Sequence, residues 1–506
     1  MNADEGWSLR PSVVPGADIA GVHASGITLA SGAVRPGDLY AALPGQRTHG
    51  ARFAADAVSR GAVAVLTDAE GADLVGALDV PVVVDADPRR RMARLAAEVY
   101  GRPAERLTML AITGTNGKTT TSYILAAALE QLGHHVGTVG TLGFALDGVI
   151  LPSARTTVTT PESPDLQALF ALLAERGADT VVMEASSHAL ALGRVEAVVF
   201  DVAAFTNLGW DHRDFHPTQE DYFEAKATLF TPERTRAAVF SVDDEWGVRL
   251  AARVRATGLP VVTTSLDGVA GATVTATWRA AEAGSEVSVV AGGRPYEMVL
   301  SLPGEHNVRN LLTATGMLLA AGLDVGAATP GFADVTVPGR MQRVRLPVGA
   351  PTVYVDFAHT PQAVEAALDA VKGGPGRTVV VLGCGGDRDS GKRGPMGRVA
   401  AERADVVIVT DDNPRLEDPL LIRQAVLAGA YEARDTADRG SRAAACDIID
   451  GGDRRSAIAA ALALAGADDV VAVLGKGHET GQEVGGRLLP FSDADVVIDE
   501  YRRTGG

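Results

Sequence analysis

The sequence predicts an α/β protein of three domains, and three observations carry this prediction. The 506 residues exceed what a single hydrophobic core usually serves. Apolar runs of strand length alternate with helical patterns along most of the chain. The 57 glycines are typical of a fold with many tight turns between strands and helices. We therefore expect a small N-terminal α/β domain at 1–106, a central parallel-sheet domain at 107–338, and a C-terminal Rossmann-like, doubly wound domain at 339–506.

The N-terminal block contains short strands and one clear helix. The apolar runs at 61–66 and 80–85 are typical of buried parallel strands. The pattern at 89–100 predicts a helix, which the sequence Gly101-Arg102-Pro103 ends.

The remaining strands are predicted from apolar runs that end in polar residues. In the central block these runs lie at 107–112, 180–184 and 198–206. The alternation of Thr and Val at 260–302 predicts a small antiparallel segment. The sequence at 337–340 indicates a domain junction. Beyond it, strands are expected at 352–356, 377–383, 405–410 and 469–475.

Composition indicates which binding partners and which cellular compartment fit this chain. The formal net charge of -17 argues against general binding to nucleic acids or anionic membranes. Only two cysteines occur, Cys384 and Cys446, so a reducing compartment fits. The N-terminus lacks the basic and apolar regions of a signal peptide, and no apolar stretch reaches spanning length. We expect a cytoplasmic protein with no membrane span.

Residues 111–120, AITGTNGKTT, are the most informative stretch. An apolar run enters a Gly-rich turn, and a helical pattern follows Lys118 and Thr119. Backbone N–H groups at such a helix N-terminus bind phosphate, the lysine reaches the β- and γ-phosphates, and the threonine hydroxyl can bind Mg²⁺. This G-x-x-G-K-T loop therefore predicts a site for a nucleoside triphosphate.

Two strand ends next to this loop carry possible cation ligands. Glu184 with 186–188 follows one strand, and 207–212 follows the next. Glu184 and His212 can bind a hard or borderline cation. Helix capping explains Ser187 better when that residue is taken alone. Lys226 lies in an amphipathic stretch at 222–230, where spacing alone favours a solvated charge.

Further polar groups follow later strands. Asn307 and Asn310 lie one turn apart at a helix start, where two amides can bind an adenine edge, although capping is a rival for Asn307. In the last domain, polar motifs end each strand and should ring one crevice. Arg388 and Arg415 there can bind carboxylates in a bidentate manner, and Glu479 can accept from an ammonium group. Such a crevice fits an amino acid.

In this order and over nearly the whole chain, these motifs resemble the Mur ligase family of ATP-dependent, amide-bond-forming enzymes of peptidoglycan synthesis. The signature at 412–415, Asp-Asn-Pro-Arg, resembles that of the branch that adds meso-diaminopimelate to UDP-N-acetylmuramoyl-L-Ala-D-Glu. The resemblance implies an acyl-phosphate intermediate, with ADP and phosphate as products. It also implies that the protein is a monomer. Because diaminopimelate carries a second carboxylate that lysine lacks, Arg415 is the expected discriminator.

The resemblance also implies roles for individual residues. Catalysis is expected from Lys118, Glu184, His212 and Lys226. ATP is expected to contact Gly114, Thr115, Asn116, Gly117, Lys118, Thr119, Thr120, Asn307, Asn310, Arg340 and Asp356. Mg²⁺ is expected on Thr119, Glu184, His212 and Lys226, the last as an N6-carboxylysine carbamate. The UDP-sugar peptide is expected on Leu29, Ser31, Gln46, Arg47, Thr48, Thr159, Thr160, Ser187 and Arg194. Diaminopimelate is expected on Arg388, Asp412, Asn413, Pro414, Arg415, Gly475 and Glu479.

Part of the N-terminal block departs from the family pattern. Relatives often carry Asp-Ser-Arg before the Pro-Gly-Asp-Leu turn at 36–39, whereas this chain has Ala30-Ser31-Gly32. Only the serine is shared, which leaves the uridine contacts open.

Four alternatives remain at this point. The same ligase can use L-lysine. A folylpolyglutamate synthetase-like ligase shares the chemistry, but the full block before the phosphate loop and the 412–415 signature disfavour it. A D-Ala-D-Ala-adding relative would not need the two arginines. A P-loop ATPase or switch differs in class, because its ATP turnover would not require both a UDP-sugar peptide and an amino acid.

Overall fold

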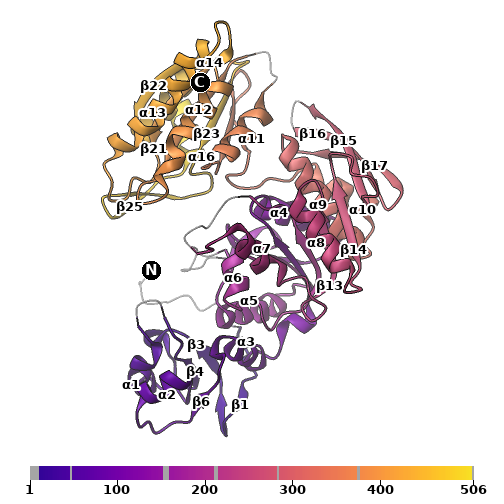
Figure 1. Ribbon diagram of the computed structural model, residues 1–506, viewed down its shortest axis with the longest axis vertical. Helices are drawn as coiled ribbons and strands as arrows, with labels where there is room; N and C mark the ends of the chain where they lie inside the picture. Colours follow the sequence, from indigo (N-terminus) through magenta and orange to yellow (C-terminus); the bar gives the residue numbers. More distant parts are fainter. Residues whose placement is uncertain are drawn as a thin grey trace. The chain divides into compact units, whose positions relative to one another are not determined.

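The computed structural model describes residues 11–45, 48–151, 159–209, 215–281, 284–372 and 376–503 (Figure 1). The chain forms two compact units. One contains Met1–Thr277, Val287–Met298 and Arg309–Ala333; the other contains Trp278–Glu286, Val299–Val308 and Asp334–Gly506. Each unit is built from sheets covered by helices, which confirms the predicted α/β class.

The N-terminal part of the first unit is a four-stranded parallel sheet. Its order is β3 (Gly26–Thr28), β4 (Asp38–Ala41), β5 (Ala64–Thr67) and β6 (Val82–Val84). The helices α1, α2 and α3 span Ala54–Ser59, Ala69–Val75 and Pro88–Val99. The two parallel strands and the helix predicted for this block are therefore confirmed. Asp87 caps α3, and Pro88 occupies its first turn, which explains why the helix begins there.

Helix α3 joins this sheet to the central domain by packing on α5 (Ser163–Glu175). Met92 and Leu95 of α3 share a buried core with Ala168 and Ala171 of α5. The N-terminal and central domains thus belong to one packed unit.

The central sheet has the order β10-β9-β8-β11-β7-β12-β13-β14-β15-β16-β17. The strands are β7 (Thr108–Thr113), β8 (Val136–Gly140), β9 (Gly143–Leu146), β10 (Val149–Leu151), β11 (Thr180–Glu184), β12 (Phe200–Phe205), β13 (Thr235–Ser241), β14 (Val261–Ser265), β15 (Val274–Ala281), β16 (Gly284–Ala291) and β17 (Arg294–Leu300). The helices that follow these strands include α4 (Lys118–Gln131), α6 (Ser187–Ala191), α7 (Gln219–Ala227), α8 (Glu245–Arg255) and α9 (Glu305–Ala320).

Strands β8, β11, β7, β12, β13 and β14 run parallel. The antiparallel segment predicted at 260–302 is therefore wrong for its first strand, because β14 pairs in parallel with both β13 and β15. Strand β14 follows helix α8, and a strand–helix–strand crossover returns the chain in the parallel direction. Thr and Val alternation predicts a strand but not the direction of its neighbour.

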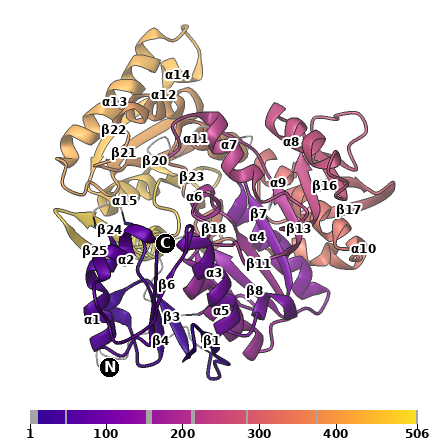
Figure 2. The same cartoon turned by 60° about the horizontal axis from the view of Figure 1, so that its bottom comes forward.

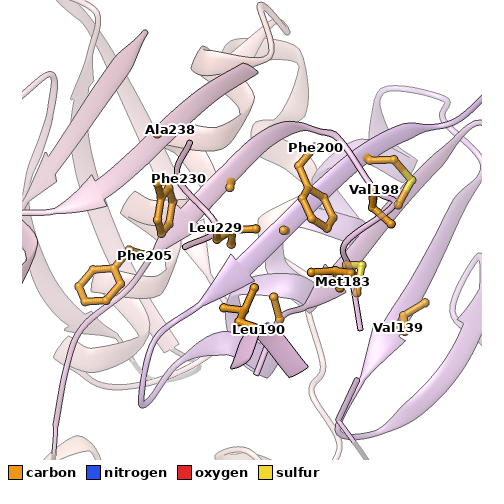
Figure 3. Packing of buried hydrophobic residues seen from close by; sticks show 14 of the residues in the cluster. Val139, Met183, Leu190, Val198, Phe200, Phe205, Leu229, Phe230 and Ala238 are labelled. Atoms are coloured by element: carbon orange, nitrogen blue, oxygen red, sulfur yellow. The ribbon is translucent and has the colours of Figure 1, made fainter. Parts of the chain in front are cut away.

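A large apolar cluster fixes the central strands (Figure 3). Met183 of β11 and Phe200 and Phe205 of β12 are fully buried in it. Leu190 of α6 and Phe230, which follows α7, belong to the same cluster. Close packing of this kind holds the strand ends rigidly, so the polar groups that follow β7, β11 and β12 have fixed positions within the described ranges.

The second unit contains a six-stranded sheet of order β18-β19-β23-β20-β21-β22. The strands are β18 (Gln342–Val344), β19 (Thr352–Asp356), β20 (Thr378–Cys384), β21 (Val406–Asp411), β22 (Asp447–Gly452) and β23 (Val470–Leu474). All pairs are parallel except β18 with β19. A small hairpin, β24 (Gly481–Val484) with β25 (Arg487–Pro490), follows the last strand of the sheet.

Helices cover both faces of this sheet. Alternate residues of the same strand enter different cores: Val380 joins Leu368 of α11 (Pro361–Val371) and Met396 of α12 (Arg393–Arg403), while Val381 joins Ile458 of α15 (Arg454–Leu464). Helices α12 and α13 (Pro419–Thr436) lie side by side, as Figure 2 shows. This arrangement confirms the predicted doubly wound fold. Across the described ranges, no helix has the length and apolar character needed to cross a membrane.

Candidate active site

The predicted phosphate-binding loop lies between β7 and α4, where the sequence places it. Gly114 and Gly117 have φ angles of +144° and +85°. A Cβ on Gly114 would lie 1.9 Å from Thr206 Oγ1, and one on Gly117 would lie 2.2 Å from Asn310 Oδ1. Both positions therefore require glycine. Lys118, Thr119 and Thr120 form the first turn of α4, where N–H groups lack helical acceptors.

Neighbouring segments hold the loop in place. Asn116 N donates to Asn207 Oδ1 at 3.0 Å, and Gly209 N donates to Thr115 Oγ1 at 2.8 Å. Thr121 Oγ1 donates to Asn310 Oδ1 at 3.3 Å, which ties helix α4 to helix α9. Asn307 lies in the first turn of α9, and its Nδ2 donates to Pro303 O at 2.7 Å.

Two lysine ammonium groups converge on one carbonyl oxygen of the loop. Lys118 Nζ donates to Gly114 O and Thr115 O, both at 2.9 Å. Lys226 Nζ donates to Gly114 O at 2.8 Å and lies 4.3 Å from the centre of the Tyr222 ring. Lys226 is only 1% exposed, so the solvated charge predicted from spacing alone is wrong. The surface pattern of a short helix does not reveal that a loop distant in sequence covers it.

Glu184 lies at the end of β11 beside the loop and is only 1% exposed. Its carboxylate accepts from Thr119 Oγ1 at 2.9 Å, from Thr141 N at 2.9 Å and from Thr141 Oγ1 at 3.0 Å. Burial, together with the charge of Glu184, raises the pKa of Tyr123 to about 12. Glu184 and Thr119 thus offer adjacent hard oxygens, which Mg²⁺ prefers.

The described residues contain no group of three or more His, Cys, Asp or Glu side chains that could hold a metal. A nucleotide-bound Mg²⁺ needs no such group, because it takes one or two protein oxygens and the rest from phosphates and water. His212 lies outside the described residues. The residues present therefore fit a Mg²⁺ that arrives with ATP.

A second network runs from Glu184 towards α3. Thr160 Oγ1 donates to Glu184 O at 2.8 Å, and Arg194 Nη1 donates to Thr160 O at 2.9 Å. Arg194 Nε also donates to Glu162 Oε1 at 3.0 Å, and Arg89 of α3 donates to Glu162 Oε2 at 3.1 Å. Glu162 therefore links the central domain to the N-terminal one, a role that the sequence analysis missed.

The serines after β11 differ from the sequence-based interpretation. Ser186, not Ser187, caps α6, because Ser186 Oγ accepts from Ala189 N at 3.2 Å. The hydroxyl of Ser187 is buried and has no hydrogen-bond partner in the described part of the chain. The capping explanation of Ser187 is therefore wrong. An unpaired buried hydroxyl is a group that a ligand can satisfy.

Fewer contacts define the other predicted UDP-sugar positions. Leu29 and Ser31 are half-buried, and Thr48 is exposed. Thr159 Oγ1 lies 3.2 Å from Thr141 Oγ1. Gln46 and Arg47 lie outside the described residues.

In the second unit, Asp356 and Arg340 lie near one another at the end of β19. Asp356 accepts from Met341 N at 2.6 Å and from Ala358 N at 2.8 Å. Burial raises its pKa, although the charge of Arg340 and these N–H groups act in the opposite direction. The Arg340 guanidinium lies 4.5 Å from the centre of the Phe357 ring.

The 412–415 signature contacts the β24–β25 hairpin. Gln482 Nε2 donates to Asp412 O at 2.6 Å, and Arg415 N donates to Glu483 O at 2.9 Å. The Arg415 Nε lies 3.3 Å from Glu483 Oε2, and its Nη1 donates to Gly386 O. Arg415 has a φ of +54°, a left-handed conformation that this pairing holds. The hairpin was not predicted.

The structure brings Asn413 and Glu479 together and leaves Arg388 exposed. Asn413 Nδ2 donates to Glu479 Oε2 at 2.7 Å. Gly475 has a φ of +117°, and a Cβ there would lie 2.5 Å from Asp412 Oδ2. The fully buried Lys476, to which the sequence analysis assigned no role, lies among these groups. Its position between two glycines, directly after a strand, was the sequence signal that could have marked Lys476 as part of this site.

Comparison with known proteins places the chain in a family. The profile of the Mur ligase family catalytic domain matches residues 23–100, that of the Mur ligase middle domain matches 112–318, and that of the glutamate ligase domain matches 339–477. The chain therefore belongs to the Mur ligase family, whose members are ATP-dependent amide ligases.

Within this family, the chain is 47% identical to UDP-N-acetylmuramoyl-L-alanyl-D-glutamate–2,6-diaminopimelate ligase of Streptomyces avermitilis, over 98% of both chains. It is 42% identical to UDP-N-acetylmuramyl-tripeptide synthetase of Leifsonia xyli, over 96% of this chain and 93% of that one. A solved structure of a UDP-N-acetylmuramoyl-L-alanyl-D-glutamate–2,6-diaminopimelate ligase matches with a TM-score of 0.70 and 31% identity over 96% of each chain.

A folylpolyglutamate synthase of Mycobacterium tuberculosis shares the fold at a TM-score of 0.60 and 21% identity, but covers 76% of this chain. The fuller coverage by the diaminopimelate ligases agrees with the argument made from the N-terminal block.

Proposed function

We propose that this chain adds meso-diaminopimelate to UDP-N-acetylmuramoyl-L-Ala-D-Glu, with ATP converted to ADP and phosphate. The observation that carries the proposal is the 412–415 signature, in which Asn413 donates to Glu479 and the Arg415 guanidinium lies beside Glu483. Relatives named for this reaction support it through identity over nearly the full chain. We propose that the enzyme acts as a monomer in the cytoplasm.

ATP is assigned to the loop between β7 and α4. The N–H groups of the first turn of α4 and the ammonium of Lys118 would hold its phosphates. Asn307 and Asn310 of α9, and Arg340 with Asp356, are assigned to the nucleoside. Thr119 and Glu184 would hold Mg²⁺, with His212 as a further ligand, and the cation would supply charge neutralisation between the triphosphate and an incoming carboxylate.

The environment of Lys226 supports the carbamate that the family resemblance implies. As an ammonium, the buried Lys226 shares the Gly114 carbonyl with the half-buried Lys118, and two like charges at this separation repel. Conversion of Lys226 to N6-carboxylysine would turn this repulsion into attraction and would provide an anionic oxygen ligand for a cation.

The substrate peptide is assigned to Thr160, Ser187 and Arg194. Arg194 uses its Nε side to bind Glu162 and one Nη1 hydrogen to bind Thr160 O. Its remaining N–H groups suit a carboxylate, and the unpaired Ser187 hydroxyl suits a further polar group of the substrate. Leu29, Ser31, Gln46, Arg47, Thr48 and Thr159 are assigned to the rest of the UDP-sugar.

The proposed reaction has two steps. The D-glutamyl γ-carboxylate attacks the γ-phosphorus of ATP, and ADP leaves. Lys118 and the loop N–H groups stabilise the negative charge that spreads over the transferred phosphoryl oxygens. The neutral amine of diaminopimelate then attacks the acyl carbon, and phosphate leaves with the acyl C–O bond broken.

Diaminopimelate is assigned to the groups after β20, β21 and β23. Arg415 and Arg388 would bind its carboxylates, and Glu479 would accept from an ammonium group. Asp412, Asn413, Pro414 and Gly475 complete this set. Lysine would leave Arg415 without a carboxylate from the substrate, which disfavours it.

The test is phosphate release with Mg-ATP and UDP-N-acetylmuramoyl-L-Ala-D-Glu, with meso-diaminopimelate or L-lysine added in parallel. The proposal predicts release with diaminopimelate and little with lysine. Release with lysine alone would keep the ligase chemistry and overturn the assignment of Arg415. Release without the UDP-dipeptide would identify an ATPase instead.

A further inference from the structure

A lysine lies buried beneath the residues assigned to the amino acid. Lys476 follows β23 between Gly475 and Gly477, and its side chain is fully buried. Taking an ammonium group out of water is costly unless acceptors surround it. The acceptors around Lys476 therefore indicate what its burial achieves.

Two hydrogen-bond acceptors and one nearby carboxylate surround the Lys476 ammonium group. Its Nζ donates to Glu479 Oε2 at 2.9 Å and to Asn413 Oδ1 at 3.1 Å, and Asp412 Oδ1 lies 3.9 Å away. Asp412 and Asn413 follow β21, whereas Lys476 and Glu479 follow β23. Strand β20 lies between these two strands in the sheet. Lys476 therefore connects two loops that the sheet keeps one strand apart.

These contacts fix the orientation of Asn413. Its Oδ1 accepts from both Lys476 Nζ and Glu483 N, the latter at 2.9 Å. Its Nδ2 must then face Glu479, to which it donates at 2.7 Å. Without Lys476, one of the two donors to Oδ1 is lost, and a turned amide would direct its NH₂ group at the Glu483 N–H.

The same contacts keep the Glu479 carboxylate charged and fix its orientation. Burial would raise the pKa of Glu479, but the charge of Lys476 and the hydrogen bonds from Lys476 and Asn413 outweigh burial and lower it. Both donors bind Oε2, while Oε1 accepts from no group in the described part of the chain. Glu479 thus presents one carboxylate oxygen to a ligand.

The backbone leading to Lys476 is anchored separately. The fully buried Arg454 donates to Leu474 O, the last residue of β23, at 3.0 Å. It also binds the fully buried Asp493 through two hydrogen bonds of 2.7 Å. The origin of the Lys476 side chain is therefore fixed independently of its ammonium group.

We infer that Lys476 is a positioning residue for the amino-acid site, which holds Asn413 and Glu479 in the arrangement that binds diaminopimelate without touching the substrate itself. This role rests on the proposed function of the site.

The experiment compares Lys476→Met and Lys476→Arg with the parent enzyme by measuring KM for meso-diaminopimelate, ATP and the UDP-dipeptide. A control variant, Arg377→Met, breaks a pair with Asp469 at the opposite end of β20 and β23. This variant shows how the loss of a charge pair elsewhere in the domain affects the KM values. Thermal denaturation of each variant gives the loss of stability.

We expect Lys476→Met to raise KM for diaminopimelate by about tenfold or more, with KM for ATP changed by less than about twofold. Lys476→Arg keeps the charge and should show a smaller rise in the same KM, whereas Arg377→Met should show none. No rise, or equal rises for all substrates, would overturn the role. If Lys476→Met does not fold, Lys476→Arg tests the role of Lys476 by the same criterion, a selective rise in KM for diaminopimelate. A parent enzyme without diaminopimelate-dependent phosphate release would instead overturn the proposed function.

Discussion

Gly140 is the last residue of β8, and its lack of a side chain leaves room for the Glu184 carboxylate. An alanine Cβ there would lie 2.2 Å from Glu184 Oε1 and 2.8 Å from its Cδ. Ordinary contact begins near 3.4 Å, so the carboxylate must retreat by about 1.2 Å. The φ of Gly140 is not positive, so the methyl group acts through its size alone.

This retreat has two measurable consequences. The hydrogen bonds of Oε1 to Thr119 Oγ1 and Thr141 N, both 2.9 Å, lengthen beyond bonding distance. Their loss costs at most about 3–6 kcal/mol of unfolding free energy, since hydrogen bonds to charged groups contribute about 1.5–3 kcal/mol each. A misplacement of about 1 Å at a reacting site lowers kcat by about 10²-fold.

The assay is phosphate release at saturating substrates over a Mg²⁺ titration, with thermal denaturation in parallel. We expect Gly140→Ala to lower kcat and to raise the Mg²⁺ concentration for half-maximal rate. The control is Gly466→Ala, whose added Cβ would meet only Asp469 Oδ2 at 3.9 Å. A folded Gly140→Ala enzyme with unchanged kcat and Mg²⁺ dependence would refute the assignment of Glu184.

Arg415→Ala should raise KM for diaminopimelate by about 10²-fold, since it removes a bidentate carboxylate partner, while leaving KM for ATP unchanged; equal effects on both constants would contradict the assignment. Lys226→Arg, which cannot carry a carbamate, should lower kcat by about 10- to 100-fold, and native mass spectrometry should detect bound CO₂ only on the parent enzyme; equal activity would argue against the carbamate. Phe200→Ala should lower the unfolding free energy by about 3–5 kcal/mol in a denaturant titration, because the ring is fully buried in the central cluster. Burial lowers the pKa of His306 and of His478 to about 4. Between the ordinary histidine pKa and pH 4, the unfolded chain therefore binds more protons than the folded one, and the free energy of unfolding should fall as the pH falls. His478→Asn should reduce the slope of the unfolding free energy against pH in this window.

The strands could be predicted because their physical signal is local. Buried parallel strands are continuous apolar runs, and the predicted bounds of β11 and β19 agree with the structure to the residue. The phosphate loop was equally accessible, because its glycines, lysine and threonine occupy fixed steps between a strand and a helix.

The contacts between distant segments could not be predicted in the same way. Lys226 is buried because its ammonium reaches Gly114, which is 112 residues away in sequence. The β24–β25 hairpin is short, carries the exposed Leu488 and Leu489, and gains its place by pairing with Arg415. The capping serine was misplaced by one residue, because the helix start depends on backbone geometry that Ser186 and Ser187 both allow.

The proposed reaction activates the D-glutamyl γ-carboxylate with ATP and joins it to diaminopimelate. The most direct measurement uses UDP-dipeptide labelled with ¹⁸O in that carboxylate and follows both products by mass spectrometry. The acyl-phosphate route predicts that one labelled oxygen appears in each phosphate released, together with a tripeptide that contains diaminopimelate. Unlabelled phosphate released while the tripeptide forms would contradict the acyl-phosphate route, and labelled phosphate without the tripeptide would contradict the assignment of the amino acid.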